Sequence, residues 1–398
     1  MQFARQRVRF SVLDGWRGIA ACGVAAFHFG VINHLYEFPL FRNASPYVDF
    51  FFVLSGFVIA HTYSSRISSV EDTVSFMVRR FGRLWPLHVF TLACLVVLEA
   101  AKLAVLAATG LSAGEAPFTG SSAASAIPAH LAFLQAVGIF HTYTWNGPSW
   151  SIGCEFWTYG LFALACVFGG RRRTALSVVF IVIGAVGLVI ANEGVLGATY
   201  DFGMFRCVVG FFTGSLTYQV FLLVDWPRRT FATLAEVIAA ASIALVVGAS
   251  GELRQIHHLF SFLPVIAFPI AILVFGRERG LLSVWLVKSP LQSLGRWSYS
   301  IYMVHFVVLT VLNSGLRVFD KIQGTNFSME KVAEGEPHFI MNLWAGDLVF
   351  VVYLTAVIGM AAITWKYVEE PFRIYFNDIA KKTDTRKVLT SGSSTNVG

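Results

Sequence analysis

Charged residues are scarce in this chain. Of its 398 residues, only 13% are Asp, Glu, Lys or Arg, whereas 56% are hydrophobic. A composition this poor in charge excludes one or two ordinary soluble domains, because their solvated surfaces need far more charged side chains. The sequence therefore indicates a polytopic, all-α integral membrane protein.

Signatures of several enzyme classes are also missing. The chain has no Gly-rich phosphate loop ending in Gly-Lys-Ser or Gly-Lys-Thr and no His-Glu-x-x-His zinc motif. Its five cysteines stand in or beside apolar stretches without the spacing of metal ligands, so we expect free, buried thiols. We predict neither a metal site nor a permanently bound cofactor.

Long apolar runs are what the sequence does contain. Windows of about 20 apolar residues predict ten transmembrane helices, at residues 13–32, 48–63, 84–108, 149–169, 174–192, 203–224, 230–249, 258–276, 297–316 and 344–366. A transmembrane domain then fills residues 1–376, and the polar residues 377–398 are expected to form a disordered tail. The arginine-rich start shows no small-residue cleavage site, so no removable signal peptide is expected.

The basic residues predict the orientation. With both termini in the cytoplasm, 22 of the 30 Lys and Arg fall in cytoplasmic segments, as the positive-inside rule requires. Residues 103–170 contain no Lys or Arg, which places the loop before the fourth span outside and makes residues 128–140 a re-entrant or interfacial segment. The net charge of +7 then reflects topology, and no nucleic-acid partner is expected.

Ionisable residues interrupt the first span. Arg17 and His28 stand there with ten residues between them. Since an Arg at the centre of a membrane helix costs roughly 2.5–3.5 kcal/mol, a function is the default hypothesis for such groups. A helical rise of about 1.5 Å per residue puts Arg17 near one face of the membrane and His28 near its middle. The pair suggests a path from a surface to a buried reactive centre.

Polar residues also occur at the ends of other spans. Asp49 opens the second span, either as a helix-start acid or as part of an active site. Arg80 and Arg83 share a helix face and could bind one phosphate group together. The alternative is that they only mark the cytoplasmic side of the membrane, which requires their charge but not their spacing. Residues 369–373, Glu-Glu-Pro-Phe-Arg, are predicted to stop the last span with interfacial salt bridges.

Two spans carry further polar clusters. Glu155 and Tyr159 lie four residues apart, on one face of the fourth span, where a carboxylate needs a partner. In the ninth span, Tyr302 and His305 recur at helical spacing, and a hydrogen-bonded core histidine is the alternative to a site residue. Both clusters are therefore candidate parts of a site inside the membrane.

Together these clusters resemble the membrane acyltransferase-3 family, from the first span to the end of the last. The family's R-x10-H element is matched by Arg17 and His28, its V-D-x-F-F-V-L-S-G-F element by residues 48–57, and its R-x-x-R element by Arg80 and Arg83. Its W-S-L-x-x-E-x-x-F-Y element is matched at Trp150, Ser151, Glu155 and Tyr159, with Ile152 for Leu and Thr158 for Phe.

The resemblance implies an O-acyltransferase that moves an acyl group, usually acetyl from acetyl-CoA, to a hydroxyl of a carbohydrate or a lipid-linked sugar. His28 would be the general base, because imidazole has an ordinary pKa near 6.5. Arg80 and Arg83 would hold the coenzyme phosphates, Arg17 the donor or the developing charge, and Glu155 would orient the acceptor. The remaining candidate substrate-binding residues are Asp49, Trp150, Ser151, Tyr159, Tyr302 and His305.

The resemblance also bears on partners and location. Some members of the family carry an esterase-like domain after the last span, whereas only a short polar tail follows here. The acyl group would then go directly to the acceptor or to a separate acyl-accepting partner protein. The expected location is a bacterial inner membrane, with membrane lipid around the helices.

A transporter or lipid flippase without covalent chemistry is the alternative. Intramembrane Arg, His and Glu also mark substrate and proton paths in carriers. Paired spans broken by Gly or Pro, in two similar halves, are not evident in this sequence, which favours the acyltransferase. A sensor or structural membrane protein is a second alternative, and it would not need His28.

Overall fold

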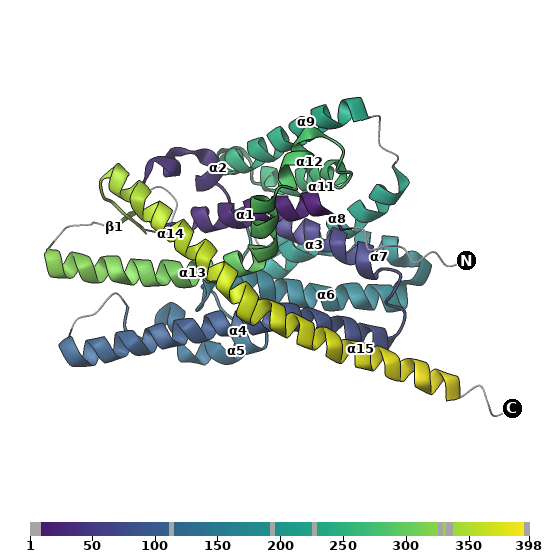
Figure 1. The fold of residues 1–398 in the computed structure, drawn as a ribbon, viewed down its shortest axis with the longest axis horizontal. Coiled ribbons are helices and arrows are strands. Elements are labelled where there is room, and N and C mark those ends of the chain that lie inside the picture. The colour runs from purple at the N-terminus through teal and green to yellow at the C-terminus, as the bar shows by residue number, and fades with distance from the viewer. Residues whose placement is uncertain are drawn as a thin grey trace.

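A computed structural model describes residues 9–110, 115–191, 196–224, 229–324, 329–331 and 337–393. Helices dominate this part of the chain (Figure 1). The longer elements are α1 (Ser11–Phe27), α3 (Tyr47–Tyr63), α4 (Val70–Thr109), α6 (Trp150–Gly169), α7 (Arg173–Ala191), α8 (Gly203–Leu223), α9 (Arg229–Gly248), α11 (Pro264–Phe275), α13 (Ser289–Gln323), α14 (Leu343–Thr364) and α15 (Glu370–Ser393).

Short elements connect these helices. They are η1 (His34–Glu37), α2 (Pro39–Arg42), η2 (Gly120–Ser122), η3 (Ala124–Ala126), α5 (Ile127–Leu131), η4 (Gly147–Ser149), η5 (Gly170–Arg172), α10 (Ser250–Ile256), η6 (His258–Phe262), α12 (Leu281–Leu286) and η7 (Trp365–Glu369). Two strands, β1 (Met329–Lys331) and β2 (Pro337–Phe339), pair antiparallel with Met329 opposite Phe339.

Each of the ten predicted spans overlaps a helical segment, which confirms the all-α membrane class. In the described part of the chain, eight helical stretches are long and apolar enough to cross a membrane. The prediction of ten is too high by this criterion, because α1 and α3 have only 17 residues each. At about 1.5 Å per residue they fall short of a hydrocarbon core about 30 Å thick.

The ends of α1 and α4 differ from the prediction. Helix α1 stops at Phe27, so His28 is its C-cap rather than a residue within a longer span. Beyond it, the segment 30–32 pairs with Phe339, whose backbone N–H donates to Gly30 O at 2.8 Å. Helix α4 begins at Val70, where the Ser69 hydroxyl accepts from the Asp72 N–H at 3.2 Å. Arg80 and Arg83 therefore lie within a regular helix.

The predicted stop after the last span is wrong. Helix α14 passes through the π-helical turn η7 and continues as α15 to Ser393. The last span therefore ends without breaking the helix, and residues 377–393 belong to α15. In Figure 1, α15 runs diagonally away from α14 toward the C-terminus.

The segment 128–140, predicted to be re-entrant or interfacial, contains no long helix. It holds the end of the five-residue helix α5 and then turns. Indole N–H groups of the flanking helices bind its backbone: Trp85 donates to Leu131 O at 3.0 Å and Trp157 to Phe133 O at 3.1 Å. The segment is thus fixed between α4 and α6.

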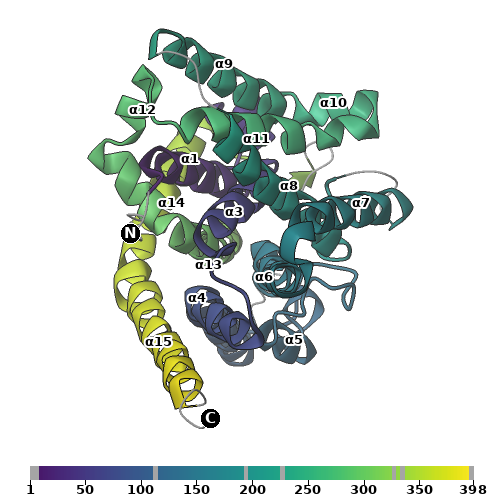
Figure 2. The ribbon, with the colours of Figure 1, turned by 90° about the vertical axis from the view of Figure 1, so that its right-hand side faces the viewer.

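Glycines let the central helices approach closely. A Cβ on Gly18 of α1 would lie 2.7 Å from the backbone N of Gly295 on α13. A Cβ on Gly56 of α3 would lie 1.8 Å from the carbonyl oxygen of Phe211 on α8. Small residues therefore bring α1 against α13 and α3 against α8. Figure 2 shows α1, α3 and α13 at the centre of the bundle.

Cysteine labelling tests the predicted orientation. Single cysteines at Ser121, in η2, and Ser68, between α3 and α4, both occupy exposed positions. In a background without the native thiols, Ser121→Cys should react with an impermeant maleimide in intact cells, and Ser68→Cys only after lysis. Labelling of Ser68→Cys in intact cells would reverse the orientation.

Candidate active site

One large cavity lies among α1, α3, α4, α6, α13 and α15. Its volume is about 1740 Å³. The predicted site residues in its lining are Arg17, Arg80, Arg83, Ser151, Glu155, Tyr159 and Tyr302. Four other predicted residues do not line it: His28, Asp49, Trp150 and His305. The cavity thus gathers most of the sequence motifs on one surface.

The lining of the cavity is strongly basic. Its nine cationic residues are Arg9, Arg17, Arg66, Arg79, Arg80, Arg83, Arg296, Arg373 and Lys381, and its four acidic residues are Asp14, Asp72, Glu155 and Glu370. Low-dielectric walls carrying an excess of one charge concentrate ligands of the opposite charge. The cavity is suited to a polyanion.

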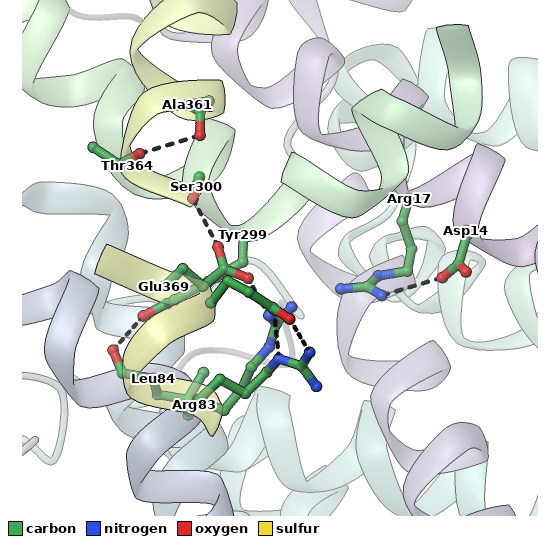
Figure 3. Close-up of polar contacts among 11 residues, drawn as sticks. Asp14, Arg17, Arg83, Leu84, Tyr299, Ser300, Ala361, Thr364 and Glu369 are labelled. Atoms are coloured by element: carbon green, nitrogen blue, oxygen red, sulfur yellow. Dashed lines mark hydrogen bonds and ion pairs between the residues drawn. The ribbon is translucent and has the colours of Figure 1, made fainter. Parts of the chain in front are cut away.

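Arg17 lines the cavity from α1, next to a carboxylate. Its Nη1 lies 3.4 Å from Asp14 Oδ1, and Asp14 also accepts from Arg9 at 2.9 Å. Figure 3 shows the Arg17 guanidinium extending from α1, with its contact to Asp14. Because Asp14 is shared by two arginines, the three groups together carry a positive charge.

A buried carboxylate holds Arg83. Glu369, at the end of η7, has a fully buried side chain and forms an ion pair with Arg83 (Figure 3). Its other oxygen accepts from the Ser300 hydroxyl at 2.7 Å, and the Tyr299 ring lies 5.4 Å from the Arg83 guanidinium. The charge of Arg83 is therefore largely compensated within the protein.

Arg80 has a different environment. Its Nη2 donates to the Tyr63 hydroxyl at 3.2 Å, and its guanidinium lies 5.3 Å from the Tyr63 ring and 5.8 Å from the Tyr159 ring. No carboxylate of the described residues forms an ion pair with it, and its buried Nε has no hydrogen-bond partner. The two arginines therefore do not share one partner. Arg83 pairs with Glu369, whereas no ion pair within the described residues balances the charge of Arg80.

Glu155 lies in the cavity wall beside Tyr159. The Tyr159 hydroxyl donates to the Glu155 carboxylate, and the Ser55 hydroxyl lies 3.0 Å from the Tyr159 oxygen. Since the Tyr159 proton is used by Glu155, Ser55 donates in the second bond. The predicted pairing of Glu155 with Tyr159 on one helix face is confirmed, with Ser55 of α3 as an added member.

Tyr302 and Ser151 line the cavity side by side. The Tyr302 hydroxyl donates to Pro148 O at 2.9 Å and lies 2.8 Å from the Ser151 hydroxyl. Phe51 of the lining packs with its ring 6.0 Å from that of Tyr302. These contacts join α13 to the start of α6.

The two candidate histidines lie behind Tyr302. The His305 ring is 5.8 Å from the Tyr302 ring and 5.0 Å from the His28 ring. His28 Nδ1 lies 2.9 Å from Val24 O, and a carbonyl oxygen only accepts, so Nδ1 carries the proton and Nε2 keeps its lone pair. His28 can therefore act as a base through Nε2.

Asp49 forms a buried ion pair with Arg206, and Trp150 lies beside this pair; neither Asp49 nor Trp150 lines the cavity. Arg206 of α8 donates to both Asp49 oxygens, at 2.7 and 2.8 Å, and its guanidinium lies 5.4 Å from the Trp150 ring. The exposed fractions of the Arg206 and Asp49 side chains are 2% and 3%. These contacts join α3, α6 and α8 and give Asp49 a clear structural role.

Sequence reasoning missed Arg206, Glu369 and Ser55. Arg206 stands in a predicted span, so its charge alone was a signal that it needs a buried partner. Glu369 belongs to the run predicted to be interfacial, and only its packing shows that it is buried. Ser55 is part of the 48–57 motif, but its contact to Tyr159 depends on how α3 meets α6.

Comparisons with known proteins cover nearly the whole chain. A model of the acyltransferase domain family matches residues 10–365. The chain is 34% identical to protein 2 in the picA locus of Rhizobium radiobacter over 198 residues, which cover 46% of this chain and 94% of that protein. It is 25% identical to acyltransferase MdmB of Streptomyces mycarofaciens, covering 76% of this chain and 79% of that protein.

A further relative is described as a membrane protein. BcsY of Komagataeibacter xylinus, whose name describes a membrane-bound transacylase, is 24% identical over 76% of this chain and 73% of its own length. No solved structure matches the chain.

Proposed function

Because this chain belongs to the acyltransferase-3 family of membrane acyltransferases, we propose that it is an O-acyltransferase that uses acetyl-CoA. The acceptor would be a hydroxyl of a carbohydrate or of a lipid-linked sugar, and the site of action a bacterial inner membrane. A carrier without covalent chemistry, which the composition left open, does not fit an acyltransferase family.

The basic cavity is the observation that carries the proposal. Coenzyme A has three phosphate groups, and nine cationic side chains line the cavity together with Tyr302. Arginine forks match phosphate geometry, and Arg80 has its charge uncompensated. We place the phosphates near Arg80 and the wider basic rim, and the thioester near Tyr302.

His28 supplies the base in this proposal. Its Nε2 accepts the proton of the acceptor hydroxyl as the hydroxyl oxygen attacks the acyl carbon. The carbon–sulfur bond then breaks, and the thiolate takes the proton from His28 to leave as free coenzyme A. Arg17 would hold the donor or the developing charge, and Glu155 would orient the acceptor.

Release of coenzyme A tests the function. Purified protein in detergent, given acetyl-CoA labelled in the acetyl group and a mixture of glycan acceptors, should yield free thiol and labelled acceptor in equal amounts. Thiol release without label on any acceptor would point to hydrolysis, and no release with any acceptor would contradict the proposal. A carrier would move intact acetyl-CoA into vesicles. Vesicles that contain this protein should therefore not accumulate unmodified acetyl-CoA.

Arg80 and Arg83 should respond differently to substitution. Arg80→Ala should raise the KM for acetyl-CoA about 10- to 100-fold, because it removes a charge-assisted phosphate contact. Arg83→Ala should instead lower thermal stability, because it leaves the buried Glu369 carboxylate without its cation. Steady-state kinetics and thermal unfolding separate the two effects.

Arg42→Ala is the matched control for both arginines. Arg42 pairs with Glu252, at 3.5 Å, and is not part of the cavity lining. Arg42→Ala should leave both the KM for acetyl-CoA and the thermal stability near the values of the unchanged protein. An unchanged KM in Arg80→Ala would remove Arg80 from the donor site.

A further inference from the structure

His305 is buried without a well-formed hydrogen bond. Its exposed fraction is zero, and neither ring nitrogen meets a partner at hydrogen-bond geometry, although the carbonyl groups of Ile301 and Tyr302 in its own helix interact with the ring. His88 and His130 are equally buried, yet each uses Nε2, toward His130 O and the Thr144 hydroxyl respectively. A buried polar group without a well-formed hydrogen bond costs free energy, so such a group calls for an explanation, for example an absent ligand.

The helix around His305 is rigidly held. Three side chains of α13 donate to neighbouring elements: Tyr299 to Leu84 O at 2.6 Å, Ser300 to Glu369 at 2.7 Å and Tyr302 to Pro148 O at 2.9 Å. In addition, Asn146 Nδ2 donates to Met303 O at 3.1 Å. Because four contacts fix this stretch of α13, His305 is held in place although its ring gains no well-formed hydrogen bond there. Such support is typical of a preorganised functional group.

The position of His305 connects the cavity with the base. Tyr302 lines the cavity, and the His305 ring lies 5.8 Å behind it. On its other side the ring lies 5.0 Å from His28, with an angle of 42° between the two planes. A thioester that passes Tyr302 would therefore meet His305 and His28 together.

We propose that His305 is a second catalytic residue, which donates its ring N–H to the carbonyl oxygen of the acyl group. The proposal rests on the acyl transfer proposed above. A neutral imidazole carries one N–H, and burial beside a second imidazole disfavours a cation on either ring. His28 takes and returns the proton of the acceptor hydroxyl, whereas His305 keeps its own proton throughout.

The step balances with these two roles. The acceptor oxygen forms a bond to the acyl carbon, and the carbonyl oxygen becomes an oxyanion that His305 stabilises. The oxyanion then reforms the carbonyl as the carbon–sulfur bond breaks, and the thiolate receives the proton held by His28. Donors of this kind act on the transition state rather than on binding of the substrate.

Three variants of His305 test the role. His305→Ala should lower kcat about 10²- to 10³-fold, the effect of losing one oxyanion donor. Its KM for acetyl-CoA should stay unchanged, because the phosphates bind elsewhere. His305→Asn, which keeps an N–H donor, should retain more activity than His305→Leu, which keeps only bulk. His130→Asn, which changes an equally buried histidine away from the cavity lining, should leave kcat near its starting value.

Thermal unfolding shows which of these variants fold. If His305→Ala does not fold, the comparison of His305→Asn with His305→Leu decides the test. Equal activity of the Asn and Leu variants would overturn the proposal. A change confined to the KM of the acceptor would also overturn it and make His305 an acceptor-binding residue. An inactive wild-type protein would instead contradict the acyl transfer itself.

Discussion

Replacing His28 with alanine is expected to lower the rate of acyl transfer about 10²- to 10⁴-fold, the usual contribution of a general base. The protein should insert and unfold as before, because the side chain of His28 makes one hydrogen bond, to a carbonyl oxygen of its own helix. The measurement is coenzyme A release by purified protein at saturating acetyl-CoA. Binding of acetyl-CoA should persist in the variant.

His141→Ala is the control for the loss of an imidazole. The His141 side chain is 84% exposed and pairs with Asp201 away from the cavity lining. It should retain full activity. Turnover of His28→Ala close to that of His141→Ala would rule out His28 as the base.

Substitution of Arg206 by alanine is expected to destabilise the protein by about 3–5 kcal/mol, because it leaves a buried carboxylate without a partner. Asp49→Ala should cost a similar amount, since it strands the guanidinium. Thermal unfolding in detergent measures both effects. A double variant with Asp49→Leu and Arg206→Met should recover much of the stability that either single variant loses, because an apolar pair removes both charges.

An exposed ion pair provides the comparison. Glu252 has 57% of its side chain exposed and lies 3.5 Å from Arg42. Glu252→Ala should change stability by no more than about 1 kcal/mol. If Arg206→Ala were as stable as Glu252→Ala, the ion pair of Asp49 would not hold α3 to α8, and a direct role for Asp49 in the site would become the better explanation.

The helices could be predicted from apolar length, but several of their ends could not. The prediction started the third span at residue 84, because the apolar window begins there. The helix starts at Val70, with its N-terminus capped by Ser69, and polar residues occupy its first turns. The first span was extended to residue 32, whereas pairing of residues 30–32 with Phe339 ends the helix at Phe27. Caps and strand pairing are not visible in hydropathy.

The parts of the site that lie on a single helix could be predicted from the sequence. The spacing of Arg17 and His28, and of Glu155 and Tyr159, already puts each pair on one helix. The partners from other helices were not predictable. Glu369 is 286 residues from Arg83, and Arg206 is 157 residues from Asp49, so these pairs arise only when the helices pack. The sequence could flag a buried charge, but only the packing identifies its partner.

The most direct test of this account is a cryo-EM structure with a thioether analogue of acetyl-CoA, which binds but cannot transfer its acetyl group. We expect the analogue in the basic cavity, with phosphate density beside Arg80 and the acetyl end at Tyr302, facing His305 and His28. An analogue bound in another cavity, or with its acetyl end directed away from Tyr302, would contradict the proposed path from the cavity to the histidine pair.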